Sequence, residues 1–208
     1  MSLTTDTPEV THAPAAHTEG HHTSTGLSNE KVGMWAFLGS ECLLFGGLIS
    51  TFLLLRGKGV VHGPQVKDLY DIPFTSVSSF VLLMSSLTMV LALSAQQRGL
   101  FQRARVWLLS TALFGMIFVS GQVYEFTSFY KEGLGFTTNL QSSAFYVLTG
   151  FHGVHVTIGI LMLISLFFMS LRGNLPTERS ETVEIIGLYW HFVDIVWILI
   201  FTVVYLIQ

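Results

Sequence analysis

The chain has 208 residues, of which 50% are hydrophobic and only 11% are charged, with a formal net charge of −3. Soluble domains carry about 25% charged residues, so this composition indicates an integral membrane protein. The sequence contains no basic run, which argues against a nucleic-acid partner. Cys42 is the single cysteine, so an intrachain disulfide is excluded.

Residues 1–28 are rich in Thr, Ala, His, Gly and Pro and show no apolar periodicity. This composition predicts a disordered tail. Its histidines could bind a divalent metal weakly, but nothing in the pattern fixes their geometry. They are His12, His17, His21 and His22. The segment lacks the basic and apolar regions of a signal peptide, so we expect the first hydrophobic segment to stay in the membrane.

Residues 29–208 are expected to form one all-α bundle of five transmembrane helices. Each apolar stretch exceeds the roughly 18 residues needed to cross a bilayer, and glycine-containing turns separate the stretches. The predicted spans are approximately 32–55, 73–95, 105–128, 141–171 and 183–207. An odd number of spans places the termini on opposite sides. Counting Lys and Arg near the spans favours an inside N-terminus and an outside C-terminus.

Six ionisable residues lie within these spans, where one charged group costs about 3 kcal/mol to insert. They are Glu41, Glu125, His152, His155, His191 and Asp194. Each has a structural interpretation, which is a hydrogen bond between helices, and a functional one, which is a proton or cofactor site. Both interpretations predict that these side chains face protein and not lipid.

The two glutamates differ in their surroundings. Glu41 lies in the sequence WAFLGSECLLFGGL, and its span contains no Lys or Arg that could pair with it. Such an acid is a candidate for a proton-related or lipid-related role, or for a hydrogen bond to a neighbouring helix. Glu125 lies nearer the outer end of its span, from which its side chain could reach the membrane interface. Glu125 is a candidate for the same proton-related or lipid-related role, but a structural or interfacial role is favoured for it.

His152 and His155 lie one turn apart among Gly150, Gly153 and Gly159, in the sequence GFHGVHVTIG. Glycines allow a second helix to approach closely. We therefore expect the two imidazoles to form hydrogen bonds across that contact.

His191 and Asp194 share a face of the last helix, because they are three residues apart. A metal would need a third or fourth ligand beyond His152 and His155, and this pair offers the obvious candidates. A haem held by two histidines would require His155 and His191 to face each other. Both are the weaker alternatives, because no further Met, Cys or His supports them.

Three segments that contain these ionisable residues together resemble subunit III of the haem-copper terminal oxidases. They are WAFLGSECLLFGGL at residues 35–48, SAFYVLTGFHGVHVTIG at residues 143–159 and LYWHFVDIVWILIFTVVYL at residues 188–206. The resemblance runs in order over residues 31–207. The chain lacks the first two helices of the seven-helix family form and matches the shorter, bacterial five-helix form. The lipid contacts that the long form makes beside those two helices are therefore not carried over to this chain.

The resemblance implies a non-catalytic subunit of a proton-pumping oxidase in the bacterial cell membrane. Such a subunit packs directly against subunit I, in a complex that includes subunit II and further small subunits. It carries no haem or copper itself, since those cofactors belong to the partner subunits, and it supports proton uptake and binds phospholipid. On this view Glu41 matches the family's buried acid. The family's interhelical polar network is matched by His152, His155, His191 and Asp194.

Three alternatives accompany this hypothesis. The electron donor of the complex is expected to be cytochrome c, with a quinol as the alternative. A chain of a different class would be an independent proton-coupled carrier, with Glu41, Glu125 and Asp194 as a relay. The absence of an internal repeat and of broken half-helices argues against a carrier. The last alternative is a membrane anchor for a b-type haem.

Overall fold

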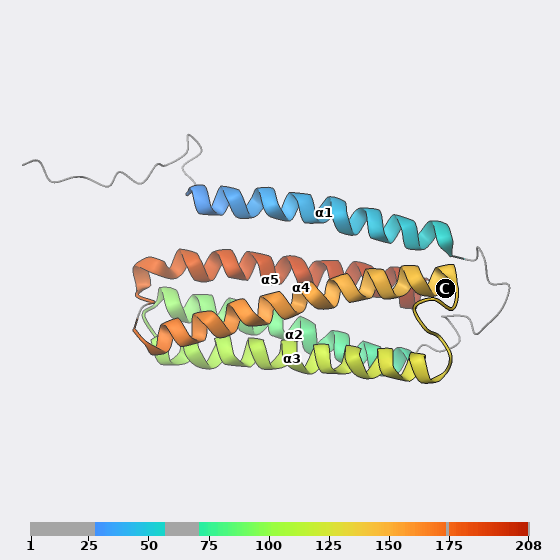
Figure 1. The fold of residues 1–208 in the computed structure, drawn as a ribbon. Coiled ribbons are helices and arrows are strands. Elements are labelled where there is room, and N and C mark those ends of the chain that lie inside the picture. Colours follow the sequence, from blue (N-terminus) through green and yellow to red (C-terminus); the bar gives the residue numbers. More distant parts are fainter. Residues whose placement is uncertain (1–27, 57–70, 174, 208) are drawn as a thin grey trace, which may run out of the picture.

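The computed structural model describes residues 28–56, 71–173 and 175–207, apart from the side chain of Glu178. Five long helices run back and forth beside one another (Figure 1). Their bounds are α1 Asn29–Leu55, α2 Ile72–Gln97, α3 Phe101–Lys131, α4 Leu140–Leu171 and α5 Ser180–Phe201. A single turn, η2 (Thr177–Arg179), precedes α5, and a π-helical turn, η3 (Thr202–Leu206), continues it. The histidine-rich tail predicted for residues 1–28 lies outside the described residues, except for Ser28.

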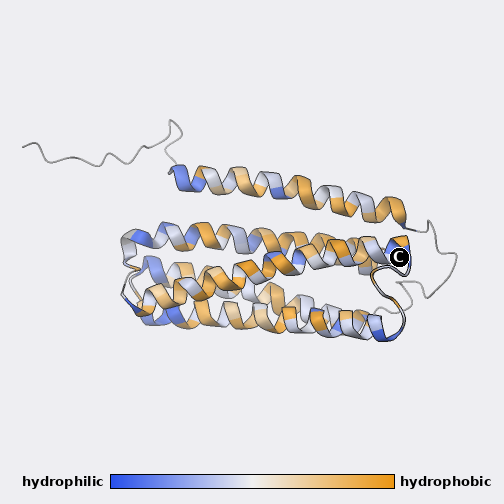
Figure 2. Ribbon diagram, in the orientation of Figure 1, coloured by the Kyte–Doolittle hydropathy of each residue, from blue (hydrophilic) through white to orange (hydrophobic). Residues whose placement is uncertain are grey.

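All five helices are long and apolar enough to cross a membrane. When α5 and η3 are taken together as one span, Ser180–Leu206, the predicted spans agree with the observed bounds to within four residues at each end. Figure 2 shows the hydrophilic residues gathered mainly toward the helix ends, with largely hydrophobic stretches between them. The prediction of a five-helix membrane bundle is confirmed, and the chain is a multi-pass membrane protein.

Local sequence signals explain where the helices begin and end. The side chains of Ser28, Asp71 and Asn139 cap α1, α2 and α4 by accepting hydrogen bonds from backbone N–H groups in the first turn. At the end of α2, Gly99 has a φ of 72°, and the N–H of Leu100 donates to the carbonyl of Ala95 at 2.9 Å. This is a Schellman ending, which favours glycine at the left-handed position. The ends of α3 and α4 also carry glycines with positive φ.

The helices α2, α3, α4 and α5 pack together, and α1 lies along the outside against α4 and α5 (Figure 1). Only Leu38, Phe45 and Phe52 of α1 are buried. They recur every seven residues, so they form one narrow stripe along α1. Large apolar side chains elsewhere on the bundle are exposed, including Leu43 at 80% and Val77 at 66%. This is the surface expected of a bundle that faces lipid and other membrane proteins.

Candidate functional site

Glu41 and His155 meet between α1 and α4, near the middle of both helices. Glu41 Oε2 lies 3.1 Å from His155 Nε2, and both side chains are largely buried. His155 Nδ1 lies 2.7 Å from the backbone carbonyl of Phe151, one turn earlier in α4. The hydroxyl of Tyr189 donates to the backbone carbonyl of His155 at 3.0 Å, which joins α5 to the same place. The structure therefore brings together two of the six residues selected from the sequence.

The partners of His155 determine how a proton is arranged in this pair. A backbone carbonyl only accepts, so His155 Nδ1 carries a proton and donates it to Phe151. If the imidazole is neutral, Nε2 is bare and the bond requires a proton on Glu41. If the imidazole is charged, Nε2 donates to the Glu41 carboxylate. In both cases one proton lies between the two side chains and can pass from one to the other.

Aromatic rings close the space around the two histidines of α4. The ring of Phe45, from α1, lies edge-on to His155 with the ring centres 5.1 Å apart. His152 is fully buried and stacks on Trp197 at 4.9 Å, with Phe118 edge-on to it at 5.9 Å. Neither nitrogen of His152 has a hydrogen-bond partner among the described residues. The two histidines thus occupy different environments, and the expected hydrogen bond at His152 is replaced by ring packing.

The polar pair of α5 faces α2. His191 Nδ1 lies 2.6 Å from the hydroxyl of Ser86, which joins α5 to α2. Asp194 is only 3% exposed, and neither carboxylate oxygen has a hydrogen-bond partner within the described part of the chain. Ser86 is near Asp194, but its hydroxyl is engaged with His191. The four residues expected to form one polar network are therefore all turned into the bundle, yet hydrogen bonds do not link them to one another.

A second set of contacts between α2 and α5 was not selected from the sequence. The indole N–H of Trp190 donates to Ser85 Oγ at 2.9 Å, and that of Trp197 donates to Ser79 Oγ at 2.8 Å. All four side chains are buried. Indole N–H groups need a partner when they are buried in an apolar core. The signal was present in the sequence, because two tryptophans seven residues apart match serines at a similar spacing on a preceding span.

Trp190 also fills a space that two glycines leave open. A Cβ atom on Gly115 of α3 would lie 2.6 Å from Trp190 Cη2, and one on Gly159 of α4 would lie 2.7 Å from Trp190 Cε3. Trp190 is 0% exposed. Among the glycines of the His152 segment, Gly159 therefore serves the approach of a ring from α5, which is the close contact that small residues permit in membrane bundles.

Glu125 is buried near the end of the bundle where the chain finishes, so its side chain does not reach the membrane interface. It is 6% exposed, and its Oε1 accepts hydrogen bonds from Thr75 Oγ1 at 2.9 Å and from the hydroxyl of Tyr205 at 3.1 Å. Tyr205 belongs to η3, the π-helical turn that continues α5. Glu125 therefore connects α2, α3 and η3, which supports the structural interpretation over the interfacial one.

The arrangement does not favour a metal or haem site at these residues. Both ring nitrogens of His155 already have partners toward α1 and within α4, whereas His191 is directed to α2. The described residues contain no group of three or more His, Cys, Asp or Glu side chains placed to hold a metal ion. The geometry instead suits a proton held between Glu41 and His155.

Comparison with known proteins identifies the bundle that carries this pair. Residues 12–208 match the family described as cytochrome c oxidase subunit III. The chain belongs to this family. Subunit III is a membrane component of the haem-copper oxidases, so the chain is a subunit of an oxygen-reducing respiratory complex, and the resemblance described from sequence is confirmed.

Relatives of subunit III with two different names match over nearly the same length. The chain is 39% identical to cytochrome c oxidase subunit 3 of Bacillus sp. (strain PS3) over 178 residues, which cover 86% of each chain. It is 37% identical to the probable quinol oxidase subunit 3 of Staphylococcus saprophyticus over 177 residues, which cover 85% of this chain and 88% of the relative. Cytochrome c oxidase subunit 3 of Alkalihalophilus pseudofirmus is 39% identical over 179 residues. The family membership is therefore shared by oxidases named for either donor.

Proposed function

We propose that this subunit III packs directly against subunit I of its oxidase and that the Glu41 and His155 pair exchanges protons in support of proton uptake. The observation that carries the proposal is the hydrogen-bonding distance of 3.1 Å between Glu41 Oε2 and His155 Nε2. The pair lies near the middle of two helices that are long enough to span a membrane. An ionisable group at that depth is costly, so one that is retained there usually has a function. The pair is covered by α1, which is the helix least embedded in this bundle.

The remaining features of the proposal follow the family. Haem and copper belong to the partner subunits I and II, with further small subunits in the complex, and this chain binds phospholipid on its exposed apolar faces. The N-terminus lies inside and the C-terminus outside, in the bacterial cell membrane. Electrons reach the complex from cytochrome c, and a quinol is the second candidate, because relatives named for both donors match equally well. Donor oxidation by the purified complex, measured with reduced cytochrome c and with a quinol, distinguishes the two.

The test of the pair is Glu41→Gln in the whole complex reconstituted into vesicles. A Gln side chain can still donate a hydrogen bond to His155 Nε2, so packing and assembly are preserved, but it cannot release a proton. We expect normal haem content and a several-fold loss of proton uptake during sustained turnover. Glu125→Gln is the matched control, since Glu125 is tied into a separate cluster. Unchanged proton uptake in Glu41→Gln over many turnovers would leave Glu41 with a structural role only.

Association with a redox partner has its own test. The chain is purified through a tag and the product is assayed for haem and copper. We expect both, together with a second large membrane subunit. A chain that purifies alone and free of both would contradict the proposed place in the oxidase.

A further inference from the structure

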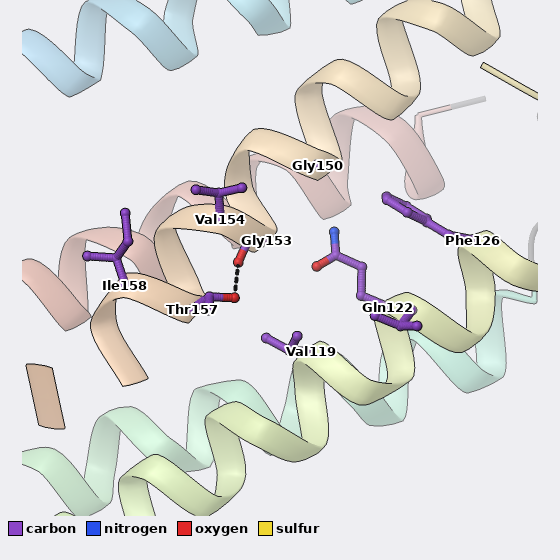
Figure 3. A pocket seen from close by; sticks show the side chains of 9 residues that line it. Val119, Gln122, Phe126, Gly150, Gly153, Val154, Thr157 and Ile158 are labelled. Carbon is purple, nitrogen blue, oxygen red and sulfur yellow. Dashed lines mark hydrogen bonds between the residues drawn. The ribbon is translucent and has the colours of Figure 1, made fainter. Parts of the chain in front are cut away.

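A groove of about 320 Å³ lies between α3 and α4, near the middle of both helices. Figure 3 shows α4 crossing above α3, with the side chains of Val119 and Gln122 pointing up from α3. Gly150 and Gly153 of α4 have no side chains to close the groove, and Val154 stands beside them. The groove opens on the surface of the bundle that faces away from its core, where Val154 is 57% exposed.

Gln122 and Thr157 are the polar side chains that line this groove. The hydroxyl of Thr157 donates to the backbone carbonyl of Gly153 at 2.8 Å (Figure 3), so Gln122 carries the acceptor that is left over. Gln122 is 7% exposed, and its Nε2 donates to the backbone carbonyl of Thr149 at 2.6 Å. Its Oε1 lies over Gly153, where a Cβ atom would approach it to 2.6 Å. Among the described residues no group donates a hydrogen bond to Oε1. A carboxamide oxygen without a donor at this depth is unfavourable, because no water is available in the hydrocarbon core.

We propose that this groove binds a transmembrane helix of another membrane subunit of the oxidase, which donates a hydroxyl or amide N–H to Gln122 Oε1. The inference rests on the proposed function and names the surface through which the complex assembles. A lipid acyl chain could fill the apolar walls but carries no donor for Gln122. A helix supplies a donor, and glycines on α4 let its backbone approach closely.

Gly150 makes the groove testable without disturbing the bundle. A Cβ atom on Gly150 meets no described atom within 4 Å, so a larger side chain would project into the groove and not into the core. The change Gly150→Leu therefore occupies the docking space while leaving this chain folded. Ser120→Leu is the matched control, because Ser120 is exposed at a similar depth and lies on another face of α3 outside the groove.

The first experiment measures how much haem-bearing partner is retained per tagged chain after a stringent detergent wash. We expect Gly150→Leu to lower retention by about tenfold, as loss of one close helix contact with its hydrogen bond would, and Ser120→Leu to retain the wild-type amount. Thermal unfolding of the purified chain should be the same for both variants. Wild-type retention in Gly150→Leu would overturn the inference.

The second experiment distinguishes a helix from a lipid. A photo-reactive phenylalanine analogue replaces Val123, which lines the groove and is 60% exposed. In the assembled complex we expect a covalent adduct with one oxidase subunit, identified by mass spectrometry. An adduct with lipid alone would overturn the inference. If the wild-type complex carries haem and copper but Val123 reacts only with lipid, the groove assignment fails and the proposed function stands; if no haem is present, the proposed function itself fails.

Discussion

The packing of Trp190 depends on the absence of a Cβ atom at two glycines. Its six-membered ring lies where Gly115 and Gly159 have no Cβ, and its N–H is satisfied by Ser85. Lipid tails are as apolar as the core, so shape and hydrogen bonds hold membrane helices together more than burial does. At this position a ring, two glycines and one hydroxyl join α2, α3, α4 and α5.

We predict that Gly159→Ala and Gly115→Ala each destabilise the bundle by about 1–3 kcal/mol, because the new methyl group would overlap Trp190. Thermal unfolding in detergent measures the effect. Gly39→Ala on α1 is the control, since a Cβ there meets no described atom within 4 Å. The argument fails if all three variants unfold together, or if the Gly39 variant is the least stable.

Among the helices, α1 is held by the fewest contacts. Besides its stripe of three buried residues, its first turn is tied to α5 by polar groups. Lys31 Nζ lies 2.6 Å from Glu184 Oε1, and the Ser28 hydroxyl donates to Glu181. These contacts fix the N-terminal end of α1, and Glu41 lies further along the same helix. The packing of α1 against His155 thus depends partly on an ion pair at this end of the bundle.

Reversing this ion pair tests its contribution. Lys31→Glu alone places two carboxylates together and should lower stability by up to about 1 kcal/mol, a small effect because both groups are partly exposed. Lys31→Glu combined with Glu184→Lys should restore the lost stability, and added salt should reduce the difference. Detergent unfolding of the four chains of this cycle is the measurement. A double variant no more stable than the single one would show that the contact is incidental.

At the scale of the whole molecule, the cations of the described residues are more numerous at one end of the bundle, because only Arg56 and Lys131 lie at the other. Arg98 and Arg103 flank the turn between α2 and α3, and Arg172 follows α4 at the same end, to which the first turn of α1 also belongs. Cytoplasmic loops of membrane proteins are enriched in such residues. The charge distribution therefore supports the inside placement of this end.

Reporter cysteines test that orientation after Cys42 is replaced by Ala. Thr137→Cys lies in the turn between α3 and α4, and Gln97→Cys lies at the end of α2 on the opposite side; both positions are exposed. We expect a membrane-impermeant thiol reagent to label Thr137→Cys in intact cells and Gln97→Cys only after permeabilisation. The reverse pattern would place the N-terminus outside.

Some features of this protein follow from local sequence alone. Hydropathy over about 20 residues and glycines at helix ends are properties of short segments, so they predicted the five helices and their bounds. The cost of charge in lipid likewise selected residues that the fold turns inward, including Glu41 and His155. These inferences need no knowledge of which helix lies next to which.

Tertiary structure decided which side chains of different helices contact one another. Hydropathy says little about how each helix is rotated about its axis or which neighbour it meets, because that depends on the fit of side chains such as Trp190 against Gly115 and Gly159. Only the packed bundle pairs His155 with Glu41, leaves His152 to stack on Trp197, and buries Glu125 beneath Tyr205. Which ionisable group can share a proton, and which merely fills space, is set by those contacts between helices far apart in the chain.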